Sequence, residues 1–335
     1  MKRKIIRFGQ SSHVISLPID WMRKKRLSKS DYVDIAEMPD GALRVGTEKR
    51  EERKQYELSY PGPMLVKPLV ISAYINGADR IRIISDKPFT REDSRAIWDI
   101  ITLLSGMEIV NESSNMVEFK CYLSPPDASM MSELKRMYRL CHEMIEDVSK
   151  SFRDKSITDS LLERTTTIER IRFLICRQAA AHGGGAEAGG CEDMRPKVLV
   201  AMALQNISHS VGHIAKVLAQ SKNVLSKKSY EEISATGGAI YTLLEDAFKA
   251  FANQDIGLAI ESYKRADEYM SKPIGVVTDI LSRKESDAAT ATKIMGSAED
   301  IVRQCKFIAY YAIDSGVMRA MTPISAQPSD TEESQ

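Results

Sequence analysis

The chain has 335 residues, of which 43% are hydrophobic and 28% are charged. This length and composition exclude a wholly disordered chain and predict several folded domains. The formal net charge is +1, so any attraction to nucleic acid has to come from local clusters of basic residues. The five cysteines lack paired metal or redox spacing, and the sequence has no apolar leader or membrane-length apolar run. We therefore expect a cytoplasmic protein.

Residues 1–48 predict a small domain in which four short strands surround one short helix. The strands are expected at residues 5–8, 14–17, 32–35 and 43–45, and the helix at 19–26, with turns at 9–12 and 39–41. A domain of about 40 residues without cysteines or ligand clusters is too small to be stable alone. We therefore expect this domain to form a homodimer.

Residues 56–124 predict a small α+β linker module. We expect a helix or buried strand at 65–73, a strand at 80–84, a helix at 90–105, and strands at 108–110 and 116–119. Gly106 ends the second helix, because glycine adopts the conformation that terminates helices at low cost.

The rest of the chain has helical apolar spacing almost to its end. The expected helices fall into two three-helix repeats, at 129–153, 158–180 and 194–221 within residues 129–221, and at 229–253, 255–283 and 287–317 within residues 229–317. The polar, acidic segment 323–335 is expected to be a disordered tail. The glycine-rich segment 182–190 lacks the Lys-Ser/Thr of a phosphate-binding loop and is read as a linker.

The first 30 residues carry nine basic side chains and one acid, Asp20. Such a cluster can bind duplex DNA, because each phosphate that is neutralised releases counterions. A solvated basic surface or a patch that binds acidic partners or lipid head groups gives the same pattern. Charge alone leaves these alternatives open.

The residues around this cluster resemble the SpoVT/AbrB-like swapped-hairpin family. The resemblance rests on residues 4–18 (KIIRFGQSSHVISLP), Trp21, Leu27 and residues 30–35 (SDYVDI), and departs at Ser30, where the family often has glycine. It implies that two chains exchange hairpins to form one barrel and that its basic arm binds double-stranded DNA. The implied DNA-binding residues are Lys2, Arg3, Lys4, Arg7, Gln10, Ser11, Ser12, Arg23, Lys24, Lys25 and Arg26.

The helical part resembles the PhoU family. Residues 168–178 (IERIRFLICRQ) and 204–215 (LQNISHSVGHIA) are similar to its second and third helices, and residues 73–81 (AYINGADRI) look like the module between the two parts in archaeal members. The resemblance implies a regulator of phosphate uptake that contacts a phosphate transporter or its sensor kinase. The expected fold is therefore multidomain: an all-β swapped-hairpin barrel with one short helix, an α+β module, and an all-α bundle of two three-helix repeats.

PhoU-like bundles hold divalent metal ions with carboxylates four residues apart on one helical face. The matching positions here read Thr165/Glu169, Gln205/His209, Tyr263/Asp267 and Glu299/Arg303, so no pair keeps two carboxylates. We expect the metal site to be lost or weakened, with Glu169, His209, His213, Asp267 and Glu299 as the remaining candidate ligands. His209 and His213 could form half of a zinc or nickel site, or they are interior or interface histidines.

No arrangement of Ser, His, Asp or Cys nominates a catalytic site, and we do not expect an enzyme. The expected function is a DNA-binding regulator whose bundle binds a partner or a signal. The alternatives are a regulator that acts only through protein or lipid contacts, without DNA, and a metal-binding or storage bundle.

Overall fold

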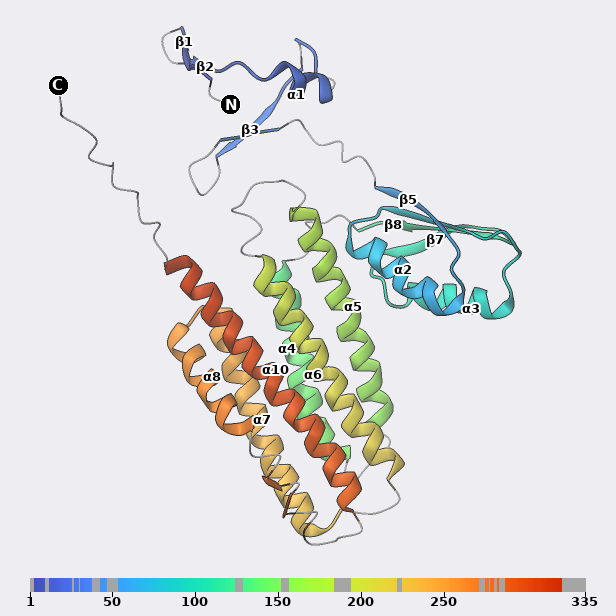
Figure 1. The fold of residues 1–335 in the computed structure, drawn as a ribbon, viewed down its shortest axis with the longest axis vertical. Helices are drawn as coiled ribbons and strands as arrows, with labels where there is room; N and C mark the ends of the chain where they lie inside the picture. Colours follow the sequence, from blue (N-terminus) through green and yellow to red (C-terminus); the bar gives the residue numbers. More distant parts are fainter. Residues whose placement is uncertain are drawn as a thin grey trace, which may run out of the picture. The chain divides into compact units, whose positions relative to one another are not determined.

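The computed structural model describes residues 3–9, 12–25, 27–29, 31–37, 43–46, 54–123, 129–151, 157–183, 194–221, 225–270, 275–276, 278–279, 282 and 287–320. The chain divides into two compact units, Met1–Arg53 and Lys54–Gln335. The second unit contains the α+β module and the helical bundle (Figure 1). The predicted tail and most of the glycine-rich linker lie outside the described residues.

The first unit consists of two separate antiparallel hairpins and one short helix. Strands β1 (Ile6–Phe8) and β2 (Ser12–Val14) form the first hairpin, α1 spans Ile19–Lys24, and β3 (Asp34–Glu37) and β4 (Leu43–Gly46) form the second. The predicted elements are confirmed, but β2 and β3 lie about two residues from their predicted positions. For β2 the cause is the tight turn at Gly9, whose φ of 69° lets the chain reverse and pair Phe8 with Ser12.

The α+β module is a four-stranded sheet with two helices packed on one face (Figure 1). Its elements are β5 (Gln55–Ser59), α2 (Pro63–Ile75), β6 (Arg80–Ile84), α3 (Arg91–Ile101), β7 (Met107–Glu112) and β8 (Met116–Cys121). The strand order is β5-β6-β8-β7, with β5 parallel to β6 and the other pairs antiparallel. Segment 65–73 is thus a helix, and β5 is a strand that the sequence pattern missed.

Local sequence explains where the module's helices begin and end. Pro63 occupies the first turn of α2, where its missing N–H costs nothing. Thr90 and Asp93 form a reciprocal capping box at the start of α3. After α3 the chain reverses at Gly106, whose φ is 70°. A Cβ at this position would lie 2.2 Å from Cγ of Leu123, so glycine is required both by conformation and by space.

The bundle consists of long helices that run side by side (Figure 1). Their bounds are α4 (Met130–Ser151), α5 (Ile157–Gly183), α6 (Met194–Gln220), α7 (Lys227–Asn253), α8 (Ile256–Met270) and α10 (Ala288–Ala320). All the predicted helices are confirmed; α8 ends at Met270, and the described residues 275–276, 278–279 and 282 of the same predicted segment are helical. No helix in the described ranges is both long and apolar enough to cross a membrane.

The two central helices, α6 and α10, join the two repeats. Each packs against both other helices of its own repeat, and α4 also contacts α7 across the repeat boundary. The buried residues of α6 recur every three or four positions, as at Val200, Leu204, Ile207, Val211 and Ile214. This spacing gives α6 a continuous apolar face that packs against its neighbours.

A buried arginine holds the module against the bundle. Arg177 on α5 is only 3% exposed, and its Nη1 donates to the carbonyl oxygens of Tyr74 at 3.0 Å and Ala78 at 2.7 Å. Its Nη2 lies 3.1 Å from Oδ1 of Asp79. Phe173, one turn earlier on α5, is buried in the core of the module.

Candidate functional site

The basic arm of the first unit is exposed wherever the structure describes it. Arg3, Lys4, Arg7, Ser12, Arg23, Lys24 and Lys25 all have exposed side chains, whereas Lys2, Gln10, Ser11 and Arg26 lie outside the described residues. Arg23 and Lys24 occupy the last turn of α1. In the described part of this unit, no ion pair joins Arg23, Lys24 or Lys25 to a carboxylate. These three charges therefore remain available to an anionic partner.

Each hairpin of the first unit also exposes an apolar face. In the first hairpin, Ile6 pairs with Val14 and Phe8 with Ser12, which places Ile6, Phe8 and Val14 on one face. Phe8 is 70% exposed, and Ile35 of the second hairpin is 63% exposed. A single copy of the chain thus leaves the apolar side of both hairpins uncovered.

The candidate metal ligands lie on two helix pairs, α5 with α6 and α8 with α10. On the first pair, Glu169 is half-buried and His209 and His213 are exposed. Thr165, the partner of Glu169 in the predicted motif, packs against α6 with its Oγ1 3.4 Å from the carbonyl oxygen of Ser208. Nδ1 of His213 lies 2.9 Å from Oγ of Ser297 on α10, so this histidine contributes to the interface between the two repeats.

On the second pair, basic side chains form ion pairs with the remaining candidate carboxylates. Lys306 forms an ion pair with Asp267, and this hydrogen bond raises the pKa of Lys306 above its ordinary value. Nη2 of Arg303 lies 2.7 Å from Oε1 of Glu299, and its Nη1 lies 2.5 Å from Oδ1 of Asp300. A fixed cation beside each carboxylate opposes the binding of a metal ion.

The structure does not bring the candidate ligands together into one cluster. Among the residues it describes, no three His, Cys, Asp or Glu side chains lie close enough to share a metal ion. Metal binding at these positions remains a prediction.

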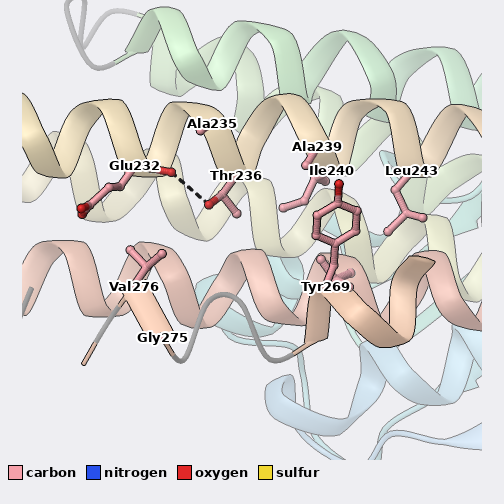
Figure 2. Close-up of a pocket in the computed structure, with 10 residues that line it drawn as sticks. Glu232, Ala235, Thr236, Ala239, Ile240, Leu243, Tyr269, Gly275 and Val276 are labelled. Atoms are coloured by element: carbon pink, nitrogen blue, oxygen red, sulfur yellow. Dashed lines mark hydrogen bonds between the residues drawn. The ribbon is translucent and has the colours of Figure 1, made fainter. Parts of the chain in front are cut away.

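One apolar cavity lies within the second repeat and is shown in Figure 2. It has a volume of about 560 Å³ and is lined by α7, by Tyr269 near the end of α8, and by Val276. Its polar groups are already engaged: Oγ1 of Thr236 donates to the carbonyl oxygen of Glu232 at 3.0 Å, and the Glu232 carboxylate lies 3.9 Å from Nζ of Lys228. The cavity therefore offers mainly apolar surface.

A row of aromatic rings lies between α4 and α7. The rings of Tyr138 and Phe248 are stacked with centroids 4.3 Å apart, and the ring of His142 lies 3.7 Å from that of Tyr241. Burial lowers the pKa of His142, opposed in part by the carboxylates of Glu245 and Glu146. The imidazole is therefore neutral at neutral pH. The sequence pattern did not reveal this row, because its members come from two distant helices.

Comparison with known proteins identifies the fold of the bundle. No family model matches the chain, and no curated protein sequence matches it. A crystal structure of PhoU from Pseudomonas aeruginosa superimposes with a TM-score of 0.53 and 16% sequence identity, over 57% of this chain and 96% of that chain. This likeness shows that the chain contains a PhoU-like helical fold.

Proposed function

We propose that this chain is a dimeric, DNA-binding regulator of phosphate uptake whose bundle binds a partner or a signal. The observation that carries the proposal is the exposed basic side chains of the first hairpin and of α1, in a unit that has no buried apolar side chain among its described residues. Duplex DNA is a polyanion that such an arm would bind, and a second copy of the hairpins would cover their apolar faces. The resemblance of the first 46 residues to the swapped-hairpin family supports the same reading.

The PhoU-like fold supports the regulatory part of the proposal. A phosphate transporter or its sensor kinase is the partner that this fold suggests for residues 129–317. In this proposal, a partner bound to the bundle changes the spacing of the two basic arms in the dimer, and so their fit to two DNA half-sites. The partner site on the bundle and the DNA-binding arms are then coupled through the dimer.

Binding of the full chain to duplex DNA tests the proposal. Replacement of Arg23, Lys24, Lys25 and Arg26 by alanine is expected to lower the affinity at least tenfold and to reduce its salt dependence, because these side chains neutralise phosphates. A control in which the exposed residues Lys135, Arg139, Lys216 and Lys264 of the bundle become alanine removes the same number of positive charges from the chain. Equal affinity of the two variants in a gel-shift titration would refute the DNA role.

A regulator that acts only through protein or lipid contacts is the alternative function. Salt-dependent binding to vesicles that contain an anionic phospholipid, with none to duplex DNA, would favour it. Metal binding at Glu169, His209, His213, Asp267 and Glu299 is tested separately, by elemental analysis of the purified protein.

A further inference from the structure

A second cavity lies between the two repeats of the bundle. It has a volume of about 450 Å³, and its walls come from α4, α6, α7 and α10. Apolar side chains such as Ile145, Val211, Ile233 and Ile301 form most of its surface. This size and lining are typical of sites for small organic ligands.

Two adjacent glycines keep one wall of this cavity open. Gly237 and Gly238 lie in the middle of α7 and both line the cavity. Glycine destabilises a helix interior relative to alanine, so two adjacent glycines in α7 call for an explanation. Close packing does not explain them, because a Cβ added at either position would meet no atom within 4 Å. What the glycines do supply is empty space at the cavity wall.

The few polar groups of the cavity restrict the chemistry of a ligand. Ser234 lines the cavity, and its Oγ is buried without a hydrogen-bond partner among the described residues. A change of its χ1 rotamer would turn this unpaired hydroxyl toward an acceptor in the cavity. Glu146 also lines the cavity, and its carboxylate disfavours an anion. Farther along α7, Tyr241 packs against the ring of His142 on α4, which burial keeps neutral.

We propose that this cavity binds a neutral, largely apolar small molecule that carries one hydrogen-bond acceptor for Ser234. The volume suits a substituted two-ring aromatic compound, whereas a helix of a partner protein, about 10 Å across, is too wide. Because both repeats contribute walls, a bound molecule links α4 and α6 to α7 and α10. The inference does not depend on the basic arm binding DNA.

The test uses the full chain and prodan, a neutral naphthalene ketone whose fluorescence shifts to the blue in apolar surroundings. Saturable binding with one dye per chain is expected. Gly237→Leu places a side chain in the cavity and is expected to weaken binding at least tenfold. Gly296→Leu on α10 is the matched control, because its added Cβ also meets no atom within 4 Å and Gly296 does not line the cavity. This control is expected to bind prodan within about twofold of the unchanged chain.

Ser234→Ala tests the polar contact independently of the volume. It is expected to weaken prodan binding about three- to tenfold and to leave binding of N-phenyl-1-naphthylamine, which lacks a carbonyl acceptor, unchanged. Circular dichroism verifies that each variant folds, and Gly238→Leu replaces Gly237→Leu if that variant does not. No saturable binding to the unchanged chain, or equal binding by the blocked and control variants, would overturn the proposal.

Discussion

Arg177 is a buried cation whose partners lie in a part of the chain about one hundred residues away. Its guanidinium also lies 5.0 Å from the ring centroid of Tyr74. The planar group reaches two carbonyl oxygens and one carboxylate at once, which the single ammonium of lysine cannot do with the same geometry. Arg177 therefore holds the module against α5 through directional hydrogen bonds as well as through an ion pair.

Arg177→Met should reduce the free energy of unfolding by about 2 kcal/mol or more, because it leaves buried acceptors without donors. Urea unfolding of the full chain measures the change, and Arg177→Lys should recover only part of it. Arg170→Met on the same helix is the control, since Arg170 is exposed and should change stability by less than about 0.5 kcal/mol. Equal stability of the two methionine variants would show that Arg177 does not hold the module in place.

His142 predicts an acid sensitivity of the bundle. Its pKa in the folded chain lies below the value of 6.5 of an unperturbed histidine, chiefly because of burial. Below that value the unfolded chain takes up a proton that the folded chain refuses, so stability is lost as the pH falls from about 6.5 toward the folded pKa. His142→Phe keeps a ring beside Tyr241 and removes the titration. The fall in melting temperature between about pH 7.5 and pH 5.5 should be smaller in this variant; an equal fall would assign the sensitivity to other groups.

At the scale of single helices, glycines have opposite roles in α7 and α10. A Cβ at Gly238 would meet no atom within 4 Å, whereas one at Gly316 would lie 2.4 Å from Cγ1 of Ile256. Gly238→Ala should therefore stabilise the chain by about 0.5–1 kcal/mol through helix propensity. Gly316→Ala should destabilise it by about 1 kcal/mol, because overpacking costs about 1–3 kcal/mol and exceeds the same gain. Thermal unfolding of both variants measures the two signs, and a stabilised Gly316→Ala would show that α8 and α10 pack less closely there.

The helices were predictable because their apolar residues recur every three or four positions over long stretches, as in α6. Strand β5 was not, because only Tyr56 and Leu58 alternate in a short segment beside a charged connector. Its parallel pairing with β6 is a tertiary interaction that no local pattern contains. Segment 255–283 was predicted as one helix: α8 ends at Met270, and the described residues beyond it, 275–276, 278–279 and 282, are helical.

The candidate sites were less predictable than the fold. The basic arm was visible because charge is a property of the sequence itself. The cavity between the repeats depends on how four helices pack, and its one sequence signal is the adjacent pair Gly237 and Gly238 inside an amphipathic stretch. The ion pair of Lys306 with Asp267 joins helices 39 positions apart in the chain, so spacing within one helix could not reveal it.

At the scale of the whole molecule, charge is distributed unevenly between the two units. Residues 1–53 contain 13 basic and 8 acidic side chains, and the rest of the chain contains 34 and 38. The first unit is therefore positive and the second is negative, although the total is +1. The net charge therefore favours attraction of a polyanion to the first unit, and this attraction should weaken steeply with salt because exposed charges are screened.

Dimerisation should depend on the apolar faces of the two hairpins. The side chains of Phe8 and Ile35 are 70% and 63% exposed in one copy of the chain, and exposed apolar surface of this kind drives association. Phe8→Ser combined with Ile35→Ser should convert the proposed dimer to a monomer in sedimentation-velocity experiments, and should lower the proposed DNA affinity by removing the second arm. Met64→Ser with Leu65→Ser is the control, because both residues are exposed on α2 of the module. A dimer that survives the hairpin substitutions but not the control would place the interface on the second unit, and DNA binding would then have to be explained by a single arm.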